Sequence, residues 1–90
     1  MNITNFKPGI ELTFKTVVAE HAKLLKALTE DDKPCFCLDL SEVIQCDSAG
    51  LALLIEAKKL CQQNDKAFTI KGISPEALSL AEFCGVKSIL

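Results

Sequence analysis

The chain has 90 residues, of which 49% are hydrophobic and 24% are charged, a balance that is ordinary for one globular domain. Its formal net charge at pH 7 is −2, and all ten of its basic residues are lysines. Arginine, tryptophan and tyrosine are absent, so the chain lacks the side chains that best bind phosphates bidentately or stack on bases. This composition disfavours nucleic-acid binding, and we expect residues 1–90 to form a single domain.

The start of the chain, Met1–Lys7, contains no apolar core and therefore does not resemble a signal peptide. The longest apolar run, Ala49–Ile55, is far shorter than the roughly 20 residues that a membrane-spanning helix needs. We therefore expect a cytoplasmic protein with no direct membrane span, which reaches a membrane only through another protein.

The N-terminal segment predicts two short strands joined by a tight turn. Residues 2–6 alternate weakly between polar and apolar side chains, Lys7–Gly9 is a turn signal, and Ile10–Leu12 is a second short strand. We expect these two strands to pair as an N-terminal hairpin.

Helical periodicity begins at Thr13, which we interpret as the N-cap of a first helix. The apolar seam of this helix comprises Phe14, Val17, Val18, Leu24, Leu25 and Leu28, with His21 among them. We expect His21 to be packed or half-exposed rather than catalytic, because no second catalytic residue is placed near it. A polar loop over residues 30–34 ends the helix.

The second half of the chain alternates strands with helices. Cys35–Leu40 is nearly all apolar, which predicts a central strand that is covered on both faces. We expect a second helix from Leu51 to about Gln63, a strand over Lys66–Gly72 and a last short strand over Val86–Leu90.

Ser74 and Pro75 predict the start of a third helix, as an N-cap followed by proline at the first helical position. This helix is expected to run to Cys84, with Gly85 at its end. The strand–helix–strand order favours parallel pairing with right-handed crossovers. We therefore predict a single α/β domain, with one mixed β-sheet of about four strands and about three helices packed on it.

The cysteines are odd in number, and most of them lie in apolar runs. They are Cys35, Cys37, Cys46, Cys61 and Cys84. This pattern is typical of reduced, buried thiols in a cytosolic protein. Cys35 and Cys37 could supply two thiolates to a metal, but no C-x-x-C pair is present and His21 lies far away in the sequence. We expect no metal and no other cofactor.

The second helix carries the most information about function. At 100° per residue, one of its faces is apolar and should pack on the sheet. That face comprises Gly50, Leu53, Leu54, Ala57, Leu60 and Cys61. Leu51 and Ile55 fall on the other side, with Ser48, Lys58 and Lys59, and have no obvious core to enter. This arrangement indicates a ridge that docks on a partner protein, the alternative being that both aliphatic side chains pack against a neighbouring loop.

Ser48 precedes this helix and has two interpretations. As an N-cap, its hydroxyl would accept a hydrogen bond from a backbone N–H of the first turn. Because a helix N-terminus also favours an anion, Ser48 could instead carry a phosphate, which Asp47 beside it would repel unless it points away. A nucleophilic serine lacks support, since the first glycine of G-x-S-x-G is missing and Asp39 and Asp47 are better explained as turn or cap groups. We expect no catalytic residue.

Two stretches of the sequence resemble the STAS family. Leu38–Val43 followed by Cys46–Leu54 is similar to the strand L-D-L/F-S and the helix-opening motif D-S/T-x-G-L of that family. The similarity continues through Ile73–Glu76 to Phe83–Val86, so it covers roughly residues 9–90. It implies a β-sheet with helices packed on it.

The STAS family has two branches that imply different partners. In the anti-sigma-factor antagonists, a partner kinase phosphorylates the serine of D-S-x-G-L and thereby controls binding. In the other branch, the domain is the small cytoplasmic subunit of the Gram-negative intermembrane phospholipid ABC transporter (the Mla system). There it binds the ATPase subunit and supports its assembly and activity.

The chain is more similar to the transporter branch, through Leu12–Val17 (L-T-F-x-T-V) and Gly50–Leu54 (G-L/V-A-L-L). This resemblance implies an ABC transporter ATPase as partner and, through it, a membrane permease, with the protein peripheral to the inner membrane. We expect the partner-binding residues to be Asp47, Ser48, Leu51, Ile55, Lys58 and Lys59. The alternative branch implies an anti-sigma factor kinase as partner and phosphorylation of Ser48.

Overall fold

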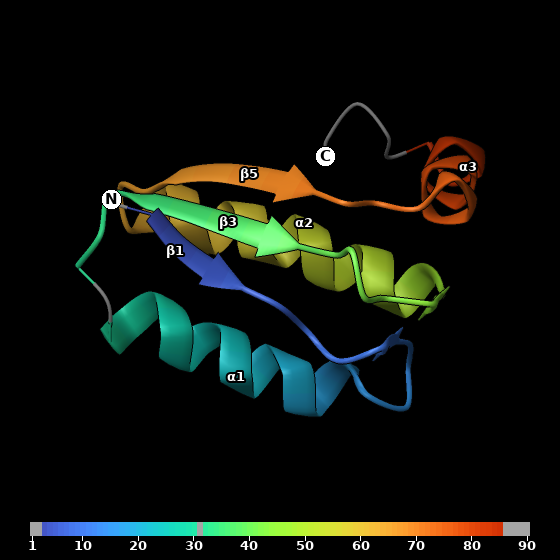
Figure 1. Cartoon of the computed structure of the whole chain (residues 1–90), viewed down its shortest axis with the longest axis horizontal. Coiled ribbons are helices and arrows are strands. Elements are labelled where there is room, and N and C mark those ends of the chain that lie inside the picture. The colour runs from blue at the N-terminus through green and yellow to red at the C-terminus, as the bar shows by residue number, and fades with distance from the viewer. Residues whose placement is uncertain (1–2, 31, 86–90) are drawn as a thin grey trace.

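The computed structural model describes residues 3–30 and 32–85, which form three helices and five short strands (Figure 1). In chain order the elements are β1 (Ile3–Phe6), β2 (Glu11–Leu12), α1 (Val17–Glu30), β3 (Cys35–Asp39), β4 (Gln45–Cys46), α2 (Ser48–Gln63), β5 (Ala67–Lys71) and α3 (Pro75–Phe83). The prediction of one α/β domain with three helices is confirmed. The last predicted strand, over residues 86–90, lies outside the described residues.

The strands form two parallel sheets. The larger has the order β1-β3-β5, and the smaller pairs β2 with β4. The expected N-terminal hairpin is therefore wrong, because β1 and β2 each pair with a strand that follows α1. In both pairings the chain crosses over through α1, as in a β-α-β unit. Every pairing among the described strands is parallel, so the predicted mixed sheet is wrong. This arrangement places the short β2–β4 sheet at the start of α2.

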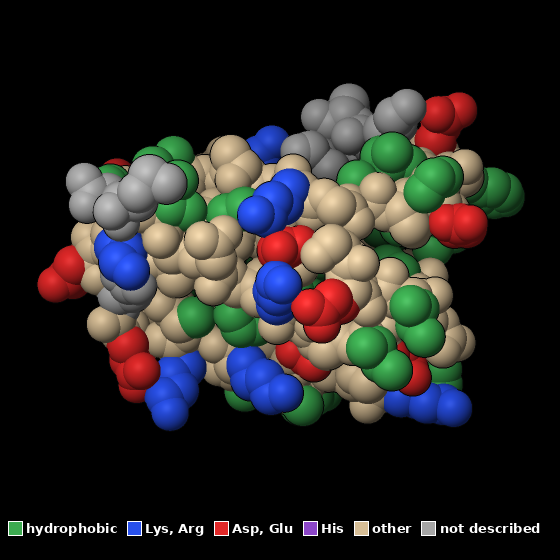
Figure 2. Space-filling view, viewed as in Figure 1, with side chains coloured by type: hydrophobic (Ala, Val, Ile, Leu, Met, Phe, Trp, Pro, Cys, Tyr) green, Lys and Arg blue, Asp and Glu red, His purple; other side chains and the backbone are tan. Residues whose placement is uncertain are grey.

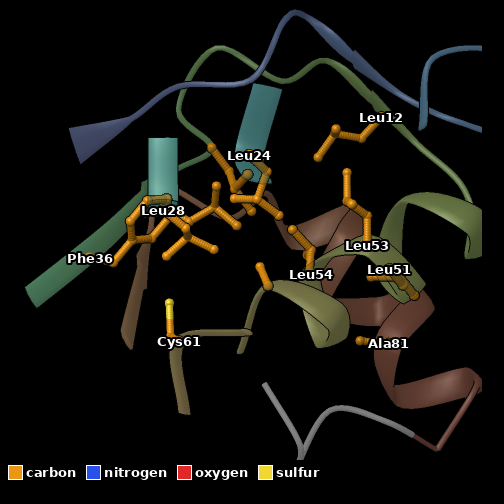
Figure 3. Close-up of a cluster of buried hydrophobic side chains, with 12 residues drawn as sticks. Leu12, Leu24, Leu28, Phe36, Leu51, Leu53, Leu54, Cys61 and Ala81 are labelled. Atoms are coloured by element: carbon orange, nitrogen blue, oxygen red, sulfur yellow. The ribbon is translucent and has the colours of Figure 1, made fainter. Parts of the chain in front are cut away.

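The hydrophobic core lies between the larger sheet and the helices. Phe36 and Leu38 of β3 point into it, and the Phe36 ring stacks between Phe6 and Phe68 of the neighbouring strands at centroid distances of 6.1 and 6.5 Å. Figure 3 shows the leucines of α1 and α2 converging on the same space. The buried cluster consists of Leu12, Leu24, Leu28, Phe36, Leu38, Leu40, Leu51, Leu53, Leu54, Ala57, Cys61 and Ala81. The predicted apolar face of the second helix is confirmed, with only Leu60 of its members partly exposed.

The opposite face of the larger sheet is not covered by α1 or α2, and it carries charged residues at the end of β3. Asp39 of β3 is buried there between Lys7 and Lys71, whose Nζ atoms lie 3.9 and 3.8 Å from its Oδ2 atom. Figure 2 shows lysine and acidic side chains gathered in the middle of this face. Hydrogen bonds from the hydroxyl and backbone N–H of Ser41 hold the pKa of Asp39 below 3.8, helped by the two lysines. The apolar run of β3 therefore does predict a central strand, but helices α1 and α2 pack on one face of it only (Figure 1).

Helix α1 begins at Val17 rather than one turn earlier. The Thr13 carbonyl oxygen accepts hydrogen bonds from the backbone N–H groups of Thr16 and Val17, both at 2.9 Å, so residues 13–16 form a turn. This turn moves Phe14 and Val18 out of the expected apolar seam, and they are 70% and 81% exposed. Leu24 and Leu28 are the fully buried leucines of α1. The interpretation of His21 as half-exposed is confirmed.

Helix α3 is capped as the sequence predicts. Ser74 is its N-cap and accepts a hydrogen bond from the Ala77 backbone N–H at 3.1 Å, with Pro75 in the first turn. The helix ends at Phe83, and Gly85 follows with a φ of +74°, a conformation that favours glycine.

The five cysteines differ in exposure more than their apolar surroundings suggest. Cys37 and Cys61 are buried, Cys35 and Cys46 are half-buried, and Cys84 is exposed. Burial raises the pKa of the Cys46 and Cys61 thiols. The expectation of buried thiols is wrong for Cys84, because it caps the C-terminus of α3 at the surface.

Candidate docking surface

The N-terminus of α2 is capped by Asp47. The backbone at Asp47 is extended, and its Oδ1 atom accepts a hydrogen bond from the Gly50 N–H at 3.0 Å. Ser48 is the first residue of the helix, and its side chain is exposed. The predicted N-cap role of Ser48 is therefore wrong, because the carboxylate one residue earlier already occupies that position. The hydroxyl of Ser48 is left facing solvent.

Asp47 also joins α2 to the turn that precedes α1. Its Oδ2 atom accepts a hydrogen bond from the Phe14 N–H at 3.0 Å, and its own backbone N–H donates to the Leu12 carbonyl at 3.1 Å. Partial burial acts to raise the pKa of Asp47, but the N–H groups of Phe14, Gly50 and Ala49 outweigh this and hold the pKa below 3.8. The carboxylate is therefore ionised at neutral pH, with both oxygens in use.

This pKa shift predicts a stability that depends on Asp47 and on pH. Because the pKa is lower in the folded state, the ionised carboxylate stabilises the fold above its ordinary pKa of 3.8, and this contribution is lost as the pH falls below that value. In urea titrations, wild-type protein should be more stable than Asp47→Asn at pH 7, and the difference should shrink from pH 5 to pH 3. Asp32→Asn, which removes an exposed loop carboxylate, is the control. A gap that stays constant across this range would show that the charge on Asp47 contributes nothing.

Gly50 allows α2 to lie directly against β2. A Cβ atom at this position would stand 2.2 Å from the Leu12 carbonyl oxygen and 3.0 Å from the Cys46 Sγ atom. The glycine of the D-S-x-G-L motif is therefore needed for close packing, and it fixes the distance between the start of α2 and the turn at Phe14.

Leu51 is not part of an exposed ridge. It is 2% exposed and belongs to the same buried cluster as Ala81 of α3. The expectation of an exposed Leu51 is wrong because α3 packs against α2 on a side that the helix periodicity alone leaves open. Ile55 and Lys58 are half-buried and Lys59 is exposed. At 1.5 Å per residue, Lys58 and Lys59 lie about 15 Å along α2 from Ser48, so the structure does not bring them to the start of the helix.

Large apolar side chains are instead exposed around the start of α2, and we call this set the apolar rim. It comprises Ile10, Phe14, Val18 and Ile44, which are 60%, 70%, 81% and 81% exposed. The Ile10 carbonyl accepts a hydrogen bond from the Ile44 N–H at 2.8 Å, which places these two side by side. Figure 2 shows exposed hydrophobic side chains at the end of the molecule where β2 and β4 lie in Figure 1.

Val18 extends the apolar rim into a groove between α1 and α2. The groove has a volume of about 380 Å³, and its lining is mainly apolar. The residues that line it are Val17, Val18, His21, Ala49, Ala52, Leu53 and Glu56. The rim was not predicted, because the helical spacing of Phe14 and Val18 is typical of residues that face the core. The threonines that flank Phe14 and Lys15 were the available signal, since such residues favour turns just before a helix.

Around the start of α2, exposed apolar side chains lie near an exposed serine. No hydrogen bond joins Ser48 to His21 within residues 3–30 and 32–85. In the same part of the chain, no group of three or more His, Cys, Asp or Glu side chains could hold a metal ion. No helix that the structure describes combines the length and apolar character needed to cross a membrane.

Solved structures with the same architecture define the class of the fold. The unphosphorylated anti-sigma factor antagonist SpoIIAA matches with a TM-score of 0.73 at 18% identity, over 96% of this chain and 75% of that one. A sulfate transporter family protein from Wolinella succinogenes matches with a TM-score of 0.77 at 16% identity, over 98% and 70%. The chain thus has the fold of a STAS domain.

The family model described as "Mlab, STAS domain" matches residues 11–90, so this chain belongs to the STAS family. The anti-sigma-B factor antagonist of Staphylococcus aureus (strain NCTC 8325 / PS 47) is 33% identical over 84 residues, which are 93% of this chain and 77% of that protein. The same protein from strain COL matches to the same extent. STAS domain proteins of these kinds are generally non-enzymatic.

Proposed function

We propose that this chain is a non-enzymatic accessory subunit of an intermembrane phospholipid ABC transporter. It binds the cytoplasmic ATPase subunit, supports its assembly and activity, and stays peripheral to the inner membrane through that partner. The observation that carries the proposal is the apolar rim around Ser48, at the position of the D-S-x-G-L motif. The family model described as "Mlab, STAS domain" supports it, as do the L-T-F-x-T-V and G-L-A-L-L stretches of the sequence.

The apolar rim favours a protein partner on physical grounds. Single apolar residues are common on protein surfaces, but four large ones around one helix end form a patch of the kind that other proteins cover. Ser48 is exposed next to Asp47, which bonds to the Phe14 N–H, and its small side chain leaves room for close approach. Docking here raises ATPase activity only if the subunit binds the active conformation of the ATPase more tightly than the inactive one.

We place the centre of the interface at Ser48, Phe14 and Ile44, with Ile10 and Val18 at its edges. Ile55, Lys58 and Lys59 lie further along α2 and would contact the partner only if the interface follows the helix. Leu51 would support the interface from inside the fold, since it is buried.

The test is a capture experiment with Ser48→Arg. A tagged chain is co-expressed with the ATPase and permease subunits of a phospholipid ABC transporter, and captured proteins are identified by mass. Wild-type protein should capture both subunits, whereas the arginine should block docking by its bulk and charge at an exposed position and leave thermal unfolding unchanged. Ser79→Arg, at an exposed serine of α3, is the matched control and should bind normally. Normal capture by Ser48→Arg would show that the interface lies elsewhere on the domain. Failure of the wild-type protein to capture the ATPase would refute the proposed function.

A second candidate function is a phosphorylation switch that acts on an anti-sigma factor kinase. It is favoured by the relatives at 33% identity, which are anti-sigma-B factor antagonists, and by the exposed hydroxyl of Ser48 at a helix N-terminus. The carboxylate of Asp47 does not separate the two functions, because an aspartate precedes the serine in the D-S-x-G-L motif that both branches of the family share. Intact-mass measurement on protein from growing and stressed cells separates the two, since the switch requires stoichiometric phosphate on Ser48 and capture of a kinase.

A further inference from the structure

The exposed surface at the start of α2 is built from two segments that are far apart in the sequence. One is the first turn of α2 with Ser48, and the other is the turn over residues 13–16 with Phe14. A single side chain, Asp47, bonds to both: Oδ1 accepts from the Gly50 N–H and Oδ2 accepts from the Phe14 N–H, each at 3.0 Å. The carboxylate of Asp47 therefore joins the two segments, in addition to the bond from the Asp47 N–H to the Leu12 carbonyl and the close packing of Gly50 on Leu12.

The turn that carries Phe14 is held rigidly although its side chain is exposed. The Thr16 Oγ1 atom accepts a hydrogen bond from the Thr13 N–H at 3.1 Å and donates to the Glu11 carbonyl at 2.8 Å. The Thr13 hydroxyl donates to the Glu11 carboxylate and accepts from the Lys15 N–H. Hence hydrogen bonds hold the backbone beneath Phe14 before any partner binds, which lowers the conformational entropy that this turn would lose on binding.

We propose that Phe14 is the aromatic anchor of the docking surface and that Asp47 is its positioning residue rather than a partner contact. The proposal rests on the proposed function, in which the partner is the transporter ATPase. It fits a partner that offers an apolar pocket to the Phe14 ring next to the small side chain of Ser48. It does not require a basic partner residue for Asp47, because both carboxylate oxygens already accept hydrogen bonds from backbone N–H groups.

Asp47→Asn separates the two roles of the carboxylate. Asparagine is as good an N-cap as aspartate, so its remaining oxygen can keep the bond from Gly50 and preserve the start of α2. Its amide nitrogen is a donor and cannot accept a hydrogen bond from the Phe14 N–H, so the link between α2 and the turn is lost while the threonine bonds within the turn remain. Phe14→Ala removes the anchor itself from an exposed site, where truncation should leave the fold intact.

The first measurement needs no partner. Amide hydrogen exchange in the isolated domain should be roughly tenfold or more faster at Phe14 in Asp47→Asn than in wild type, since the amide loses its acceptor. The Gly50 amide, whose acceptor is retained, is the internal control. Unchanged exchange at Phe14 would overturn the positioning role of Asp47, whether or not the ATPase is the partner.

The second measurement is a double-mutant cycle on affinity for the purified ATPase subunit. Phe14→Ala should weaken binding by roughly tenfold or more, as expected of a buried aromatic anchor, and Asp47→Asn by a smaller factor. The double variant should bind no more weakly than Phe14→Ala, because Asp47 acts through Phe14. If the double variant loses affinity by the product of the two single fold-changes, Asp47 contacts the partner directly. Full binding by Phe14→Ala would show that Phe14 is not the anchor. No binding by wild-type protein would refute the proposed function, while the exchange result would still decide the role of Asp47.

Discussion

Replacing Gly50 with alanine is expected to destabilise the domain by about 3 kcal/mol, a large share of the roughly 5–15 kcal/mol that keeps a small domain folded. The added methyl group would stand 2.2 Å from the Leu12 carbonyl oxygen, and neither the backbone of β2 nor the helix can move aside without opening the core. Intrinsic helix propensity predicts the opposite sign, since alanine is favoured over glycine by about 1 kcal/mol within a helix. Urea denaturation followed by far-UV circular dichroism measures the difference.

Gly85→Ala is the matched control for Gly50. At Gly85 no atom lies within 4 Å of the position that a Cβ would take, but the φ of +74° is unfavourable for alanine, so a loss of about 1 kcal/mol is expected. A Gly50→Ala variant as stable as wild type would mean that α2 does not lie against β2 at this distance. The same variant should also disturb the bonds of Asp47, because the clash pushes apart the segments that Asp47 joins.

Local sequence signals predicted the elements whose form depends on near neighbours. The apolar run at Cys35–Leu40 gave the central strand, the periodicity of the second helix gave its buried face, and Ser74 and Pro75 gave the start of α3. Each of these signals arises within one helix or strand, so a pattern of apolar and capping residues is sufficient to find it.

The errors concern contacts between segments that are distant in the sequence. Two short strands around a turn are typical of a hairpin, and only the pairing with β3 and β4 across α1 shows otherwise. Asp47 displaced Ser48 as the N-cap because its extended backbone aims the carboxylate at the helix and at Phe14 together. The D-S-x-G-L motif placed the candidate surface at the start of α2, and this placement stays a prediction. The exposed apolar side chains near it were not predicted, because they come from the neighbouring turn and strand.

The position of Leu51 illustrates this limit, and it leads to a prediction that separates stability from docking. Leu51→Ala should lower the free energy of unfolding by about 2–5 kcal/mol, because a fully buried leucine leaves a cavity between α2 and α3. Ile55→Ala, at a half-buried position four residues further on, should lower it by less. Urea denaturation gives both values, and capture of the ATPase at a temperature where both variants are folded gives their binding.

Once the folded fraction is accounted for, Leu51→Ala should bind like wild type, since Leu51 stabilises the fold without reaching its surface. A variant that kept full stability and lost binding would place Leu51 in the interface, which is incompatible with its burial.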